Sequence, residues 1–241
     1  MNTNKKYIGM LIILLFGGFL SLFNETILNI VLPDLMKVMR VNAGTVQWLA
    51  TGYMLIVVIM VPLSAPLLRT FSVKKLYIGA MSLFLLGTIM AMLADNFIVL
   101  LLARIVQALG TGLLAPIMMS AAVATTPLTK RGSVMALCTS IILVGPSFGP
   151  IVSGIILQIA TWRMLFALLI PLIIFCIIGA CYLLGSPLPL TKPKIDYLSV
   201  ILIASGLACT VYAISTLDTA IFWGIKGVIV LIGLVALIMF Y

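Results

Sequence analysis

Residues 7–32 read YIGMLIILLFGGFLSLFNETILNIVL, and the only charged side chain among them is that of Glu25. A helix needs about 20 mainly apolar residues to cross the hydrocarbon core of a bilayer, where lipid offers the backbone no hydrogen-bond partner. Lys5 and Lys6 precede this run, as in a signal peptide, but the apolar region of a signal is only about 7–15 residues long. We therefore expect a first membrane span that is retained.

The composition extends this interpretation to the whole chain. Hydrophobic residues make up 64% of the 241 positions, charged residues make up 8%, and histidine is absent. A soluble domain needs a charged surface, so we expect an all-α membrane protein. Eight stretches qualify as spans: residues 7–32, 46–68, 75–94, 97–119, 133–157, 164–185, 197–216 and 222–241.

The basic residues between these runs predict the orientation. With a cytoplasmic N-terminus, nine of them lie inside (Lys5, Lys6, Arg69, Lys74, Lys75, Lys130, Arg131, Lys192 and Lys194) and three outside (Lys37, Arg40 and Arg163). Cytoplasmic loops of membrane proteins carry such an excess of Lys and Arg. We expect a multi-pass protein of the cell membrane whose net charge of +9 reflects topology and not a nucleic-acid partner.

Three charged residues lie within predicted spans. Lys226 is five residues into the last span and can extend to the membrane surface. Glu25 and Arg104 each lie seven residues from the outer end of their spans, near Leu32 and Phe97, which places both about 10 Å deep. One interpretation is a structural ion pair. The other is a protonatable carboxylate whose pKa is set by burial and by the cation, so that the two residues couple proton movement.

Polar residues accompany this pair. Asn24 and Asn29 flank Glu25, while Gln107 and Thr111 follow Arg104 at helical spacing. They are candidates for lining a cavity that holds a substrate, or for hydrogen bonds that hold helices together.

The fifth predicted span is rich in glycine and proline. It contains Gly145, Pro146, Gly149, Pro150 and Gly154. Proline bends a helix and glycine allows close helix contact, so this segment is a candidate hinge, with a purely structural kink as the alternative.

No set of residues for enzymatic or metal chemistry occurs in the sequence. It has no histidine, no closely spaced acid pair and no phosphate-binding glycine-rich loop, so we expect neither an enzyme nor an ATP-driven pump, and no cofactor. We expect the four cysteines, Cys138, Cys176, Cys181 and Cys209, to be packing residues.

Five stretches between about residues 20 and 175 occur at the spacing of one transporter family. They are Leu22–Pro33, Gln47-Trp48 with Tyr53, Arg104–Gly112, Gly145–Gly154, and Trp162-Arg163 with Phe166 and Pro171. In them the chain resembles the drug/proton antiporters of the major facilitator superfamily, in its fourteen-span branch. The end of the second span and the loop after it depart from the family pattern, because Ser64, Leu68 and Ser72 stand where Gly, Asp and Gly are usual. Its basic residues Arg69, Lys74 and Lys75 would form the cytoplasmic gate loop.

The resemblance implies an organisation. Residues 1–186 would be the N-terminal six-helix half of a transporter, 187–196 a cytoplasmic linker, and 197–241 two additional membrane helices. A C-terminal half, which transport would require, would then be missing from this chain, whose last apolar run stops at Tyr241 without a polar tail. We therefore expect a truncated form of a longer protein.

The resemblance also implies a function. The lipid-embedded protein would export small amphipathic drugs in exchange for protons, with Glu25 taking a proton from outside. The alternatives are a transporter of a metabolite or peptide with the same fold, and an inactive fragment or assembly partner.

Overall fold

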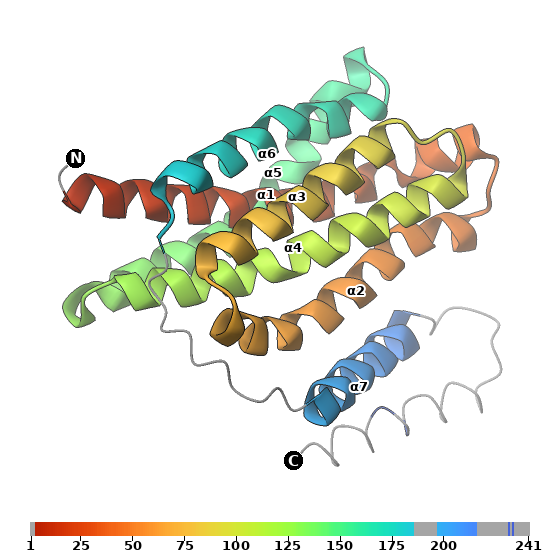
Figure 1. The fold of residues 1–241 in the computed structure, drawn as a ribbon. Helices are drawn as coiled ribbons and strands as arrows, with labels where there is room; N and C mark the ends of the chain where they lie inside the picture. Colours follow the sequence, from red (N-terminus) through yellow and green to blue (C-terminus); the bar gives the residue numbers. More distant parts are fainter. Residues whose placement is uncertain (1–2, 186–196, 216–230, 232, 234–241) are drawn as a thin grey trace.

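The computed structural model describes residues 3–185, 197–215, 231 and 233. This part is helical (Figure 1). Its elements are α1 (Thr3–Met39), α2 (Ala43–Thr70), α3 (Val73–Met92), α4 (Phe97–Thr125), the 3-10 turn η1 (Leu128–Lys130), α5 (Arg131–Ile159), α6 (Arg163–Leu183) and α7 (Tyr197–Ser215).

Six helices, α1 to α6, are long and apolar enough to cross a membrane. They confirm the first six predicted spans. Helix α7 forms where the seventh was expected, but its described apolar stretch, Leu202–Tyr212, is shorter than a span. The predicted eighth span, the linker at 187–196 and Lys226 lie outside the described residues, apart from Leu231 and Gly233.

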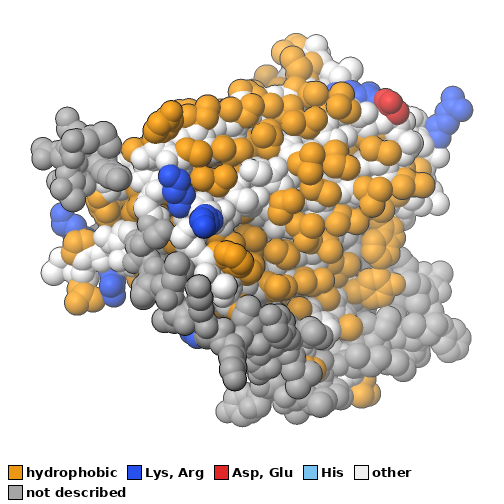
Figure 2. Space-filling view, viewed as in Figure 1, with side chains coloured by type: hydrophobic (Ala, Val, Ile, Leu, Met, Phe, Trp, Pro, Cys, Tyr) orange, Lys and Arg blue, Asp and Glu red, His pale blue; other side chains and the backbone are white. Residues whose placement is uncertain are grey.

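The six long helices form one bundle in which successive helices run in opposite directions (Figure 1). Helix α1 contacts α2, α4, α5 and α6, while α3 packs on α4 and α6, and α7 lies along α2. The N-terminus and the α2–α3 and α4–α5 turns share one end, which we call the N-terminal end (Figure 1). On the face shown in Figure 2, apolar side chains cover the flank, and charged ones lie toward the two ends.

Polar caps and one left-handed residue set the helix ends. Asn42, Ser72 and Asn96 each accept a hydrogen bond from a backbone amide in the first turn of α2, α3 and α4. Helix α1 ends at Met39, because Arg40 has a positive φ of 54° and turns the chain. The first predicted span ended at residue 32, whereas the helix runs through Pro33 to Met39. The helix continues past Pro33 since Leu35, in the following turn, is fully buried.

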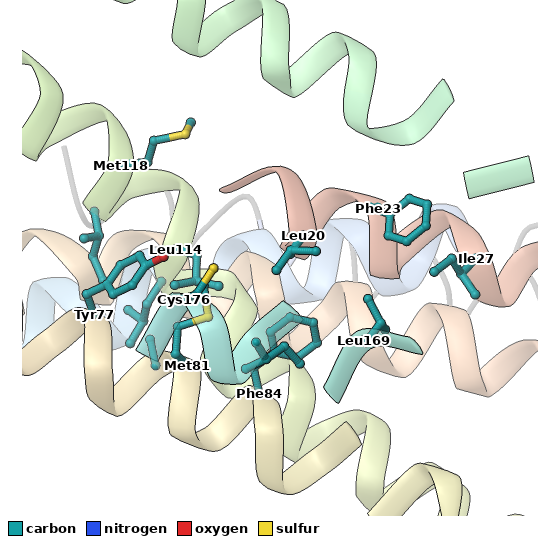
Figure 3. Close-up of a cluster of buried hydrophobic side chains, with 14 of the residues drawn as sticks. Leu20, Phe23, Ile27, Tyr77, Met81, Phe84, Leu114, Met118, Leu169 and Cys176 are labelled. Atoms are coloured by element: carbon teal, nitrogen blue, oxygen red, sulfur yellow. The ribbon is translucent and has the colours of Figure 1, made fainter. Parts of the chain in front are cut away.

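The apolar core lies between α1, α3, α4 and α6 (Figure 3). Its labelled members are Leu20, Phe23, Ile27, Tyr77, Met81, Phe84, Leu114, Met118, Leu169 and Cys176. All four cysteines are free thiols. Cys138 and Cys176 are buried, as a packing role predicts, whereas Cys181 is exposed.

Glycines allow three helix pairs to approach closely. A Cβ atom on Gly110 of α4 would lie 2.8 Å from the backbone nitrogen of Phe84 on α3, and one on Gly112 would lie 2.8 Å from the Cβ of Met60 on α2. On α5, a Cβ at Gly149 would lie 2.8 Å from the Cβ of Thr26 on α1. Small residues therefore set the spacing of the bundle, as they do in membrane helix pairs generally.

The contrast between Gly149 and Gly154 gives a first prediction. Gly149→Ala should lower the thermal unfolding midpoint in detergent, because the new methyl group forces α1 and α5 apart at a cost of about 1–3 kcal/mol. Gly154→Ala is the matched control, since no atom lies within 4 Å of its added Cβ. It should leave the midpoint unchanged or raise it slightly, through better helix propensity. Equal midpoints for the two variants would contradict the close α1–α5 contact.

Candidate functional site

Glu25 lies on α1, half-buried, at a small pocket formed by α1, α2 and α4. The pocket has a volume of about 50 Å³, enough for water. Its lining residues are Ser21, Leu22, Glu25, Tyr53, Val57, Val61, Thr111, Gly112 and Ala115. Within the described part of the chain, the Glu25 carboxylate has no hydrogen-bond or ion-pair partner. It is therefore available for a proton or a cation.

Arg104 is buried beside this pocket, with 1% of its surface exposed. Its guanidinium carbon lies 3.9 Å from the centroid of the Tyr53 ring, which is the geometry of a cation–π contact. Its Nη1 donates a hydrogen bond of 2.9 Å to Oε1 of Gln107, whose Nε2 in turn donates to Thr88 at 2.9 Å. An aromatic face and an amide oxygen thus stabilise the buried charge.

Tyr53 connects the Glu25 pocket with the buried arginine. Its ring contacts Arg104, and its hydroxyl shares a hydrogen bond of 2.7 Å with Thr111. The Nδ2 of Asn24 donates to the same hydroxyl at 3.5 Å. We call Asn24, Tyr53, Thr88, Arg104, Gln107 and Thr111 the buried polar network.

Glu25 and Arg104 do not form the structural ion pair that one interpretation of the sequence expected. Tyr53 borders both residues, and among the described residues no salt bridge joins the two charges. Helical rise predicts only that Glu25 and Arg104 lie at the same depth in the membrane. The distance between them across the bundle depends on the side chain that lies between their helices.

The four polar residues expected to line a cavity have different surroundings. Thr111 lines the Glu25 pocket and also belongs to the buried polar network. Asn24 and Gln107 are buried in that network, where they join helices by hydrogen bonds. Asn29 is exposed and separate from it.

Two buried polar atoms of the network have no partner among the described residues. They are Oδ1 of Asn24 and Nε of Arg104. A buried polar group without a hydrogen bond costs roughly 1–3 kcal/mol. A movement of either side chain that gives its atom a hydrogen-bond partner would therefore be favourable.

The candidate hinge is a continuous helix. Pro146 and Pro150 lie within α5, which runs unbroken from Arg131 to Ile159. Gly145 and Gly149 are buried against α1, whereas Gly154 faces open space.

The basic residues of the predicted gate loop lie at the N-terminal end. Arg69 is exposed in the last turn of α2, and Lys74 and Lys75 are in the first turn of α3. Lys74 donates a hydrogen bond to the backbone oxygen of Cys181 and so ties α3 to α6.

An ion pair at the opposite end was not foreseen from the sequence. Arg163 lies 3.2 Å from Asp95 and donates a 2.7 Å hydrogen bond to the carbonyl of Ala94. Its guanidinium also stacks on the Trp162 ring at 4.6 Å. These contacts join the α3–α4 and α5–α6 turns.

Comparisons with known proteins agree with this architecture. Residues 14–241 match the sequence model of the Major Facilitator Superfamily. The chain is 40% identical to the lincomycin resistance protein LmrB of Bacillus subtilis, over 98% of this chain and 50% of that protein. It is 28% identical to the multidrug resistance protein B homolog of Mycobacterium tuberculosis, over 72% of this chain and 32% of that protein. The chain therefore spans about half or less of the length of these relatives.

A solved structure has the same fold. It is the crystal structure of the human organic anion transporter MFSD10, with a TM-score of 0.68 over 84% of this chain and 54% of that one. The sequence identity is 12%, so the likeness concerns the fold alone.

The buried polar network gives a second prediction. Gln107→Leu removes the hydrogen-bond acceptor of Arg104, so the free energy of unfolding should fall by about 1.5–3 kcal/mol. Thr88 keeps its hydrogen bond to the Phe84 carbonyl. The main cost of the substitution is therefore the lost hydrogen bond of Arg104. In the double variant with Arg104→Met the total loss should be smaller than the sum of the single losses, because no charge remains without an acceptor.

Unfolding in detergent, followed by circular dichroism, measures this cycle. Gln158→Leu, at an exposed glutamine of α5, is the matched control and should change stability by less than about 0.5 kcal/mol. If the loss in the double variant equals the sum of the two single losses, Gln107 does not stabilise the charge of Arg104.

Proposed function

The chain belongs to the major facilitator superfamily, and we propose that it forms the N-terminal part of a proton-coupled exporter of amphipathic drugs. The observation that carries this proposal is Glu25. It is the only glutamate of the chain, it lies in a membrane-spanning helix, and it lines a pocket without an ion-pair partner among the described residues. Ionisable groups within membrane spans are costly and generally serve ion or proton pathways.

In this proposal the N-terminal end faces the cytoplasm of the cell. The basic residues Arg69, Lys74, Lys75, Lys130 and Arg131 support this orientation, because the turns that carry them lie at the same end as the N-terminus (Figure 1). Membrane proteins keep such residues on the cytoplasmic side.

The coupling step is a proton transfer to and from the Glu25 carboxylate. A proton from outside binds a carboxylate oxygen and forms an O–H bond, which neutralises the charge. Its release to the cytoplasm restores the carboxylate. Each elementary charge that crosses a potential of 100 mV supplies about 2.3 kcal/mol, enough to bias a conformational cycle.

The buried polar network transmits the change in this proposal. The ionised carboxylate attracts Arg104, whose Nε has no partner among the described residues, whereas the neutral acid does not attract it. Tyr53 borders both groups. A shift of Arg104 toward Glu25 therefore disturbs the hydrogen bonds of the Tyr53 hydroxyl with Thr111 and Asn24. Protonation on α1 is thereby coupled to α2 and α4.

The names of the relatives support the drug as substrate, because LmrB is a lincomycin resistance protein and the mycobacterial relative is a multidrug resistance homolog. The relatives are two to three times as long as the matched region, so we propose that transport requires a second half. Purified alone and reconstituted in vesicles, the 241-residue chain should then give no flux. Robust flux would require that two copies assemble.

A third prediction tests the carboxylate. In a full-length form, Glu25→Gln should abolish dye efflux driven by a pH gradient in everted membrane vesicles, because glutamine cannot bind or release the coupling proton. The matched control is Asp34→Asn, at an exposed acid near the end of the same helix, which should retain the efflux. Proton-driven efflux at the original rate in Glu25→Gln would remove Glu25 from the coupling step.

A growth assay against a panel of antibiotics tests the substrate class. Cells that express the full-length form should tolerate at least one amphipathic drug better than cells with Glu25→Gln. Unaltered tolerance to every drug, together with proton-coupled flux, would instead favour a metabolite or peptide as substrate.

A further inference from the structure

A second and larger hollow lies on the outside of the bundle, near its N-terminal end. Its volume is about 520 Å³, and its lining includes Phe71, Lys75, Gly79, Leu83, Leu86 and Leu113. None of its residues lines the Glu25 pocket. The hollow is therefore a separate site, and its occupancy does not depend on the proposed transport function.

The hollow follows one face of α3 over a length that matches one leaflet of a bilayer. Lys75, Gly79, Leu83 and Leu86 recur at helical spacing, and all four are exposed. The stretch from Lys75 to Leu86 spans about 16 Å at the rise of an α-helix. One leaflet of the hydrocarbon core is about 15 Å thick, which is the length of an acyl chain lying in it.

Gly79 gives the hollow its depth. A Cβ atom at this position would meet no other atom within 4 Å, so the glycine is not required by a helix contact. The hollow is closed on one side by Leu113 of α4, which is 5% exposed, and Phe71 lies at the N-terminal end. An apolar, open-sided hollow of this kind within the membrane suits hydrocarbon.

The positive charge at one end of the hollow favours an occupant with an anionic group. Of the described residues that line the hollow, only Lys75 is charged, and it lies in the first turn of α3, close to the helix end. Among the described residues its Nζ has no hydrogen-bond or ion-pair partner, in contrast to Lys74, which is bound to Cys181. Two lysines at a helix N-terminus are unfavourable, because that end carries a partial positive charge, and an anion there offsets the repulsion.

We propose that the hollow binds an anionic phospholipid, with one acyl chain along Gly79, Leu83 and Leu86 and the lipid phosphate on Lys75. A free phosphate would leave the apolar length unfilled, and a neutral hydrocarbon would leave the lysine without a counter-ion. Basic pockets between membrane helices bind anionic headgroups in this way. The occupant belongs to the leaflet at the N-terminal end of the bundle.

Native mass spectrometry of the purified 241-residue chain tests this site. The chain is exchanged into micelles that contain equal amounts of dioleoylphosphatidylglycerol and dioleoylphosphatidylethanolamine, and the retained lipid is identified. The wild-type chain should retain the anionic lipid in preference. Lys75→Gln should lose the preference, and Gly79→Leu should lose both lipids, because the leucine fills the hollow.

Two controls match these changes. Lys130→Gln removes an exposed cation from the same end of the bundle, and Gly154→Leu enlarges a glycine that also faces open space on α5. Both should retain the anionic lipid as the wild type does. Circular dichroism verifies that each variant is folded. If Gly79→Leu does not fold, the lipid preference of Lys75→Gln alone tests the proposal.

Three results would overturn the proposal. They are equal retention of the two lipids by the wild type, unchanged preference in Lys75→Gln, and complete displacement of the anionic lipid by excess inorganic phosphate.

Discussion

A guanidinium with 1% of its surface exposed needs hydrogen-bond acceptors and a stabilising field that lipid and aliphatic side chains do not supply. Arg104 obtains them from Tyr53 on α2 and from Gln107 one turn along α4, and Gln107 bonds in turn to Thr88 on α3. These contacts require that three helices pack in one register. The close approach of α3 and α4 makes the register possible, since a Cβ on Gly87 would lie 2.6 Å from the backbone nitrogen of Gln107. Gly87 and the buried arginine are thus parts of one arrangement.

The sequence predicted the six long helices well, because the bilayer imposes one requirement on every span. Apolar length determines the existence of a helix but not its ends. Helix α1 passes Pro33 because Leu35 is buried beyond it, and burial in a tertiary contact is not visible in a local apolar pattern. The last predicted span and the linker fall outside the described residues, so they stay predictions.

The candidate site was predicted in part. Helical rise placed Glu25 and Arg104 at one depth, but it could not show that the Tyr53 ring covers the arginine. Tyr53 entered only as part of a sequence motif, although a tyrosine hydroxyl deep in a span is itself a signal of a buried hydrogen bond. Asn24 and Asn29 looked equivalent beside Glu25, yet the first is buried and the second exposed, because a separation of five positions turns the helix to another face. The roles of these residues in proton coupling stay predictions.

The wall of the Glu25 pocket consists of two kinds of residue, and this division bears on how the protein can evolve. Tyr53, Thr111 and Gly112 are held by hydrogen bonds or by close helix contact, so a change in any of them disturbs the bundle. The side chains of Val57, Val61 and Ala115 also line the pocket, but none is fully buried. Substitutions at these three positions can alter the size of the pocket at little cost to stability. Sequence changes on α2 and α4 can therefore alter the volume of this pocket without removing the contacts of the buried arginine with Tyr53 and Gln107.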